Sequence, residues 1–480
     1  MPGAPTPDPI STKLQRIAKL AREMPDTAFF SLAHHIDLEF LREAHRLTRK
    51  GGAVGVDGQT AAAYAENLDE NLTSLLNRFK TGTYRAPPVR RVHIPKGDGK
   101  TRPIGIPAFE DKVLQRAVTM VLEAVYEQDF LDFSYGFRPK RSAHQALEVL
   151  WKELMAVGGG WVLEVDIKAF FDTLVPGLLR TFLDQRVRDG VLRRVIGKWL
   201  KAGVMEDGCV THPELGTPQG GVVSPLLANI YLHEVLDKWF VKDVQPRLAG
   251  RASMIRYADD VLIVFSTESD ARRVMAVLPK RFGKYGLTVH PDKTRLIPFQ
   301  KPSRPPGVSS GTAKVPGVFD LLGFTHFWGR TRKGGWAVTR NTAKSRFKRG
   351  TTAIDEWCRS NRHWKVSEQH RTLSQKLSGH YQYYGITGNY RALTRFRNET
   401  EKTWKKWLTR RSEKKRMAWT QFARLKERYP LPAAKVAKSV YRPQQTRVSG
   451  SRMRYVASPI MLRRWRNRLS FLGSWPRFTT

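Results

Sequence analysis

Apolar residues recur at helical spacing in two segments near the start of the chain. Residues 12–22 carry an amphipathic pattern behind a proline-rich stretch, and residues 38–49 carry a second one. Glycine commonly ends a helix, and Gly51 follows the second segment closely. The pattern therefore predicts two helices and a helical N-terminal extension over residues 1–54.

The spacing changes between residues 85 and 107, where two extended arms flank a Gly-Asp-Gly turn at residues 97–99. Helical periodicity returns over about residues 111–128. The apolar runs at 161–167 and 261–265 each indicate a strand, with helices between them. A hairpin, further strands and helices in one chain predict an α+β fold.

The last third of the chain has another character. Residues 300–318 are rich in Pro, Gly and Ser, which predicts a loop or linker. From about residue 340 to 428 the pattern is helical and basic, until Pro430 and Pro432 interrupt it. A final basic segment covers 441–480, and no repeat of the solenoid kind is visible.

Charge separates this last third further from the rest of the chain. The whole sequence has 83 Lys plus Arg against 43 Asp plus Glu, a net charge of +40, but residues 331–480 alone hold 37 against 7. Eight of the 13 Trp residues lie there too. Interleaved cations and aromatics predict a polyanion-binding surface. The alternative is a solvated charged face over a Trp-rich core, although self-repulsion then burdens the fold.

Several classes of protein are excluded by the same sequence. A membrane-spanning helix needs roughly 20 apolar residues, and runs such as 261–265 are far shorter. The start of the chain has no signal-peptide pattern, so we expect a cytoplasmic protein. Cys209 and Cys358 are the only cysteines, which rules out a disulfide framework and fits a reducing compartment.

The first candidate for chemistry is Asp166, at the end of an apolar strand and shortly before Phe170 and Phe171. An acidic residue at the end of a strand is fixed on a rigid element, and the two aromatics after it suit a flat substrate beside the carboxylate. An Asp in this position is also common as a turn or helix-cap residue. This segment therefore leaves both interpretations open.

The second candidate is the adjacent pair Asp259 and Asp260, directly before an apolar strand. A polar hairpin turn is the simple interpretation. However, neighbouring carboxylates repel each other unless a cation lies between them. Mg²⁺ prefers oxygen ligands, and two such ions about 4 Å apart can clamp an in-line phosphoryl displacement. Asp166 and Asp259 can share such ions if their strands pair in one sheet.

Eight ordered motifs then make the pattern specific. Together they resemble the group II intron-encoded reverse transcriptase and maturase family, in the form that lacks a C-terminal HNH endonuclease, since no His or Cys follows residue 430. Weaker similarity to the thumb and maturase region of that family covers residues 376–389. The eight motifs are residues 55–58, 94–107, 134–144, 166–172, 216–225 with Asn229, 257–260, 291–294 and 322–324.

The resemblance implies a right-hand polymerase architecture. Fingers at 55–150 and a palm with an antiparallel sheet at 151–330 would precede a mostly α-helical thumb and maturase domain at 331–440. Residues 441–480 would form a basic C-terminal appendage. The resemblance further implies that Asp166 and Asp259 ligate two Mg²⁺ ions, which Mn²⁺ could replace. Asp260 would complete the carboxylate cluster, and the carbonyl of Ile167 would be a further ligand.

The resemblance also assigns a dNTP pocket. Phe171 falls at the steric gate, where its ring would exclude a ribose 2′-OH. Lys96 and Arg102 would reach the triphosphate, and Gln219 would support the pocket beside glycines that allow close backbone approach. The alternatives are core packing for Phe171 and solvated hairpin charges for the two cations. Phe170 and Phe171 are expected to face opposite ways, as consecutive strand residues do.

Nucleic-acid contacts are the remaining assignments. For Arg138 and Lys293 the alternative is a structural ion pair, and for the tyrosines it is core packing. Stacking on RNA suits Tyr, whereas Arg and Lys suit contacts with the phosphate backbone. The candidates are Arg138, Lys293, Tyr381, Tyr384, Arg463, Arg464 and Arg466.

The leading hypothesis is an RNA-directed DNA polymerase of a mobile group II intron that also binds the intron RNA and assists its splicing. Its partners would be intron RNA, an RNA template with a DNA primer, target DNA and dNTPs, in a bacterial cytoplasm and without a membrane. A maturase that does not polymerise is a rival, which the acidic set opposes. A third hypothesis places the polymerase in phage defence or CRISPR adaptation.

Overall fold

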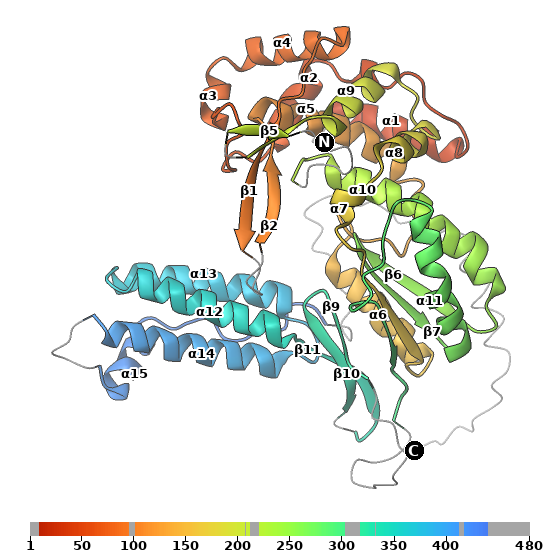
Figure 1. Cartoon of the computed structure of the whole chain (residues 1–480). Coiled ribbons are helices and arrows are strands. Elements are labelled where there is room, and N and C mark those ends of the chain that lie inside the picture. Colours follow the sequence, from red (N-terminus) through yellow and green to blue (C-terminus); the bar gives the residue numbers. More distant parts are fainter. Residues whose placement is uncertain are drawn as a thin grey trace, which may run out of the picture. The chain divides into compact units, whose positions relative to one another are not determined.

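The computed structural model in Figure 1 describes residues 9–95, 101–206, 208–211, 220–302, 317–331, 333–411 and 417–439. Contacts divide the chain into a large unit, Met1–Ala437, and a short one, Lys438–Thr480. All elements named below belong to the large unit. No helix in these described ranges is long and apolar enough to cross a membrane.

The first part of the chain is helical, as expected. Asp37 begins the second helix by accepting a hydrogen bond from the amide of Phe40 at 2.9 Å. The first two helices pack against the long fifth helix, whose buried residues belong to the largest core cluster. The helices are α1 (Pro9–Glu23), α2 (Leu38–Leu47), α3 (Ala61–Glu66), α4 (Leu68–Thr81) and α5 (Phe109–Tyr126).

The expected hairpin is confirmed as β1 (Val89–Pro95) and β2 (Thr101–Ile106), which pair antiparallel. It is part of a four-stranded sheet in the order β2-β1-β4-β5. Two short strands from much later in the chain, β4 (Val204–Glu206) and β5 (Cys209–Thr211), complete this sheet, with β1 and β4 parallel. These two strands could not be predicted from the sequence, because three residues are too few to show a period.

A second sheet has the order β6-β7-β3-β8 and is antiparallel throughout. The two strands expected from apolar runs are its central pair. Both are almost continuously buried, since Leu163 and Ile263 pack into one core cluster and Val162 and Leu262 into another on the opposite face. The strands are β3 (Trp161–Val165), β6 (Ala252–Tyr257), β7 (Asp260–Phe265) and β8 (Arg295–Pro298).

Most of the chain between these strands is helical, and two of the helices contact the sheet. α6 (Ala143–Ala156) contacts β6, and α11 (Glu268–Gly283) contacts β3, β7 and β8. The others are α7 (Phe170–Thr173), α8 (Pro176–Asp184), α9 (Gly190–Leu200) and α10 (Ser224–Leu232), the last of which continues into two π-helical turns, His233–Asp237 and Phe240–Val244.

A three-stranded antiparallel sheet follows, which the sequence did not predict. Its strands are β9 (Phe319–Leu321), β10 (Phe324–Arg330) and β11 (Trp336–Thr342). The expected basic helices then appear around a separate core cluster that includes the fully buried Trp404. They are α12 (Lys344–Ser360), α13 (Val366–Tyr384), α14 (Tyr390–Thr409) and α15 (Trp419–Arg428).

Candidate active site

Strand pairing brings the three predicted aspartates to one edge of the β6-β7-β3-β8 sheet. Val165 at the end of β3 pairs with Val261, so Asp166 follows directly beside Asp260. Tyr257 pairs with Asp260, which leaves Ala258 and Asp259 as a two-residue turn between β6 and β7. In antiparallel strands, residues opposite each other point to the same face, so the register sets Asp166 and Asp260 side by side.

The electrostatics of Asp260 show how close the charges lie. Burial, followed by the carboxylates of Asp259 and Asp166, raises the pKa of Asp260 to about 6. The guanidinium groups of Arg346 on α12 and Arg102 on β2 oppose this shift. The side chain of Asp260 still reaches solvent, so its desolvation comes from crowding by protein atoms and not from complete enclosure.

Lys293 lies in the same site, just before β8. Its Nζ is 3.1 Å from Oδ2 of Asp166, and the hydroxyl of Thr294 accepts a hydrogen bond from the amide of Asp166 at 3.2 Å. Lys293 and Asp166 border a cavity of about 360 Å³ that Asp260 and Asp292 also line. Lys293 was expected either to contact nucleic acid or to form a structural ion pair, and the structure contains the ion pair.

The donor set suits a hard cation. Carboxylate oxygens are the ligands that Mg²⁺ takes from proteins. Burial is the largest cause of the raised pKa of Asp260, and a cation would relieve the repulsion by Asp259 and Asp166 that adds to it. Within the described ranges, no group of three or more His, Cys, Asp or Glu side chains is arranged as a finished metal site. The residues therefore fit the ion by the chemistry of their oxygen donors.

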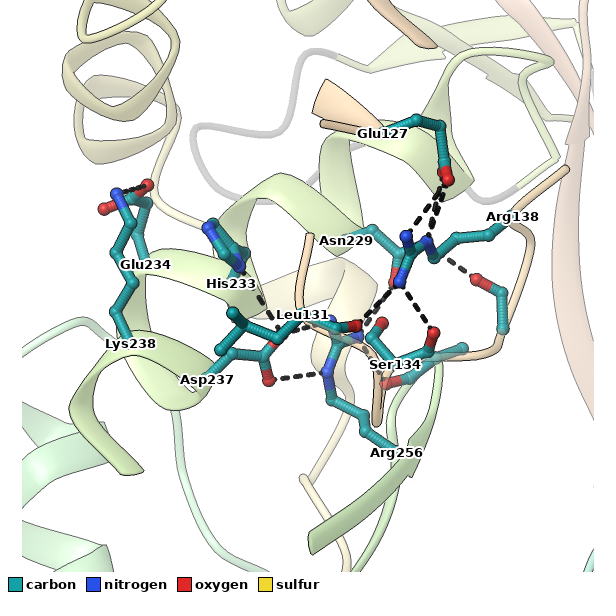
Figure 2. A network of polar contacts seen from close by, with 12 residues as sticks. Glu127, Leu131, Ser134, Arg138, Asn229, His233, Glu234, Asp237, Lys238 and Arg256 are labelled. Carbon is teal, nitrogen blue, oxygen red and sulfur yellow. Dashed lines mark hydrogen bonds and ion pairs between the residues drawn. The ribbon is translucent and has the colours of Figure 1, made fainter. Parts of the chain in front are cut away.

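A buried polar network around Arg256 (Figure 2) reaches the aspartate turn through the carbonyl of Ala258. Arg256, the residue before Tyr257, is fully buried and donates to both carboxylate oxygens of Asp237, at 2.8 and 2.5 Å. Its Nη1 also donates to Oδ1 of Asn229 at 2.8 Å and to the carbonyl of Ala258 in the turn at 3.1 Å. One guanidinium thus links the turn to α10 and the π-helical segment behind it.

Burial alone would raise the pKa of Asp237, but the adjacent guanidinium of Arg256 and the ring of His233 together outweigh it and keep that pKa below its ordinary value. The pair is therefore charged at neutral pH. A buried ion pair whose hydrogen bonds are all made fixes geometry, because loss of either partner leaves an uncompensated charge.

A glycine completes the support of the turn. A Cβ on Gly136 would lie 2.2 Å from the amide nitrogen of Ala258, so only glycine allows this contact. The carbonyl of Gly136 also accepts a hydrogen bond from Asn229 at 2.8 Å. Ala258 has a φ of +58°, a left-handed conformation that costs a non-glycine residue energy. The surrounding contacts therefore impose the shape of the turn.

Arg138, expected to contact nucleic acid or to form an ion pair, is 6% exposed. Its Nε donates to Glu127 at 3.1 Å, and its Nη1 donates to the carbonyls of Leu131 and Ser134 at 2.8 Å each (Figure 2). The side chain thus links Glu127 to the loop that carries Gly136, and the structure contains the ion pair.

The expectation that Phe170 and Phe171 alternate as strand residues is wrong. Ala169 adopts a left-handed conformation, with φ of +47°, and starts the short helix α7 that contains both phenylalanines. Phe170 is 4% exposed, whereas Phe171 is half-buried, and their rings meet edge to face with centroids 5.4 Å apart. Two different environments still result, but the rotation of a helix produces them.

The other dNTP candidates are partly placed. Arg102 lies on β2 opposite Ile94, and its charge acts on Asp260. Lys96 and Gln219 lie outside the described residues, as do Arg463, Arg464 and Arg466. Beside Gln219, the segment after Gly220 is held by Gln115 on α5, whose Oε1 accepts hydrogen bonds from the amides of Val222 and Val223 at 2.6 and 3.3 Å.

Of the candidate stacking residues, Tyr381 is 4% exposed and donates its hydroxyl to the carbonyl of Pro432 at 3.2 Å. Tyr384 is half-buried against Phe324, with ring centroids 5.3 Å apart. Both rings thus contribute to packing. Arg346 and Asp237 were missed by sequence reasoning, because nothing in their local sequence links them to strands that lie roughly 90 and 20 residues away in the chain.

Comparison with known proteins gives the geometry a context. Residues 94–325 match the family described as reverse transcriptase (RNA-dependent DNA polymerase). Protein YkfC of Escherichia coli K12 is 36% identical over 296 residues, which are 54% of this chain and 76% of YkfC. The group II intron-encoded protein LtrA of Lactococcus lactis is 39% identical over 239 residues, 49% of this chain but 39% of LtrA. A nuclear intron maturase of Arabidopsis thaliana is 26% identical over 233 residues, 40% of this chain and 30% of that protein.

Proposed function

The chain belongs to the group II intron-encoded reverse transcriptase and maturase family, and we propose that it extends a DNA primer on an RNA template at the site of Asp166, Asp259 and Asp260. One observation carries the proposal. Asp166 and the adjacent pair Asp259 and Asp260 come from two distant segments and meet at the ends of paired strands. Burial, followed by the carboxylates of Asp259 and Asp166, raises the pKa of Asp260 to about 6. Such clustering costs stability, and catalytic sites are where proteins commonly keep it.

The chemistry is attack of a primer 3′-OH on the α-phosphate of a dNTP, which forms the new phosphodiester bond, breaks the bond between the α-phosphorus and the oxygen that bridges to the β-phosphate, and releases pyrophosphate and the proton of the 3′-OH. Two Mg²⁺ ions, or Mn²⁺ in their place, would be held by Asp166 and Asp259, with Asp260 and the carbonyl of Ile167 beside them. When bound, they supply charge stabilisation at the attacking and leaving oxygens. The ammonium of Lys293 pairs with Asp166 at 3.1 Å and offsets part of the negative charge at the site.

Recognition of the nucleotide is assigned to residues on several elements. Arg102 and Lys96 would bind the triphosphate, and Arg346 joins them because its charge also acts at Asp260. The half-buried ring of Phe171 would exclude a 2′-OH, and Gln219 would line the pocket. The β1-β2 hairpin would then serve as fingers, the β6-β7-β3-β8 sheet as palm and α12–α15 as thumb, within 55–150, 151–330 and 331–440.

The maturase role rests on charge. Residues 331–480 hold 37 basic and 7 acidic residues. This positive charge suits binding to the phosphates of an intron RNA, of a template and of target DNA. The names of the intron-encoded and maturase relatives support this partner class. The corresponding location is the cytoplasm of a bacterium, in association with nucleic acid.

The direct test is Asp259→Ala in a primer-extension assay on an RNA template with Mg²⁺. We expect extension to fall by about 100-fold or more, because one shared ligand of the metal pair is gone. Binding of structured RNA, measured by filter retention, should change less than twofold. Asp26→Ala, at an exposed position in the N-terminal region, is the matched control and should extend normally. Extension by Asp259→Ala at the unaltered rate would refute the site.

A further inference from the structure

Residues of α8, of α9 and of the segments that enter β1 and β4 line a cavity of about 960 Å³. None of its lining residues borders the smaller cavity at Asp166 and Asp260. None comes from β3, β7 or the turn between β6 and β7, which carry the aspartates. This cavity is therefore separate from the proposed polymerase site.

The lining is strongly cationic. A single carboxylate, Asp184, is present, and it pairs with Arg193 at 2.7 Å. Lys198 donates to the carbonyls of Gly82 and Tyr84 at 2.6 and 2.5 Å, which holds its ammonium at the wall. Six basic residues line the space, namely Arg85, Arg180, Arg193, Arg194, Lys198 and Lys201.

Three of these cations have no acidic partner. Arg85, Arg180 and Arg194 are exposed, and each forms no ion pair within the part of the chain that the structure describes. A fold gains nothing from unpaired like charges placed around one hollow, because they repel each other. An anionic ligand would remove that repulsion.

The floor of the cavity is apolar. Leu183 and Ile196 are 3% and 2% exposed and belong to the main core, and Ala86 and Pro88 extend this surface. Guanidinium groups around an apolar cavity floor suit a ligand that has phosphates along one edge and flat, weakly polar rings along the other edge. A nucleotide has that construction, whereas an acidic peptide offers carboxylates without the flat faces.

Size narrows the ligand further. The volume lies near the upper end of the 300–1,000 Å³ or so that small-ligand pockets span. A concave space of this size takes a few nucleotides of one strand but not a double helix. We propose that the cavity binds the phosphodiester backbone of a single-stranded nucleic-acid segment, held by Arg85, Arg180 and Arg194 and with its bases against Leu183 and Ile196.

The test is photo-crosslinking with the full-length protein. A six-nucleotide RNA with 4-thiouridine should crosslink to α8 and α9, as mapped by mass spectrometry of peptides. In Arg180→Gln/Arg194→Gln this crosslinking should fall about tenfold, the order expected for losing two charge-assisted phosphate contacts. A DNA hexamer with 4-thiothymidine identifies the source, because the nucleic acid whose crosslinks are lost is the one that the cavity holds.

The matched control is Arg272→Gln/Lys280→Gln on α11, which removes two exposed charges outside the cavity. It should keep the crosslinks to α8 and α9 within twofold. Equal loss in both double variants would reduce the effect to net charge and overturn the proposal, as would unchanged crosslinking in the cavity variant. Displacement of the RNA by a poly-glutamate peptide at equal charge would assign the cavity to an acidic protein instead. Melting curves verify that both variants fold.

Primer extension separates this proposal from the polymerase assignment. Arg180 and Arg194 lie outside the catalytic set, so on a short template and primer the cavity variant should extend within twofold of the unaltered protein. If primer extension falls in proportion to the crosslinks, the cavity is part of the path that the template follows to the polymerase site, and the proposal of a separate site is refuted. Asp259→Ala, in contrast, should keep the crosslinks.

Discussion

Single residues show how the site stores unfavourable electrostatics. The pKa of Asp260 is raised to about 6 by burial and by the carboxylates of Asp259 and Asp166. An Asp in an unfolded chain titrates near about 4. Because the folded-state pKa is the higher one, ionisation of Asp260 destabilises the metal-free fold above pH 6, and this penalty disappears as the pH falls from about 6 to about 4.

We therefore expect Asp260→Asn to melt at a higher temperature than the unaltered protein at pH 7.5 in EDTA. The difference should vanish near pH 4, where both proteins carry a neutral side chain. Added Mg²⁺ should stabilise the unaltered protein more than the variant. Thermal melting across this pH range provides the measurement, with Asp26→Asn as the exposed control. A variant that melts lower at pH 7.5 in EDTA would contradict the electrostatic account.

At the scale of elements, the aspartate turn depends on segments that never touch the substrate. Arg256 on β6 reaches Asp237 in the π-helical turn, Asn229 on α10 and the carbonyl of Ala258 (Figure 2). The hydrophobic pattern predicted β7 and the helices, because periodicity is local. The network was not predictable, because its partners meet only after the sheet and α10 have packed together.

Asp237→Ala should lower the free energy of unfolding by about 3–5 kcal/mol, since it leaves the buried guanidinium of Arg256 without a partner. Urea unfolding measures this change. Glu268→Ala breaks the exposed pair with Arg272 on α11 and should cost less than about 1 kcal/mol. If the network positions the turn, the folded fraction of Asp237→Ala should also extend primers at least tenfold more slowly. Equal stability losses in the two variants would contradict the structural role.

Across the whole molecule, positive charge and aromatic side chains divide their roles. Trp404 is fully buried and donates to Gln369 at 2.8 Å, whereas Trp364 and Trp419 are 48% and 60% exposed. The core of α12–α15 therefore contains some of these rings, as the Trp-rich core in the alternative interpretation requires. The exposed rings are those that the polyanion-binding interpretation needs, and that interpretation stays a prediction.

Affinity for structured RNA should consequently fall steeply with salt. If six or more phosphates are neutralised, raising KCl from 50 to 200 mM should weaken binding by about 1,000-fold or more. Filter binding at several salt concentrations gives the slope of log affinity against log salt. A nearly flat slope would mean that the net charge of +40 serves something other than RNA binding.

The sequence by itself determined the local features of this protein. Apolar spacing gave the β1-β2 hairpin, the strands β3 and β7 and the basic helices, because period and turn residues are encoded over a few neighbouring positions. The motifs also singled out Asp166, Asp259 and Asp260. Only the tertiary structure decided that Arg346 and Lys293 face these carboxylates, that Arg138 and Tyr381 pack inside, and that a cationic cavity forms at α8 and α9. Such proximity depends on packing between distant segments, which no local pattern contains.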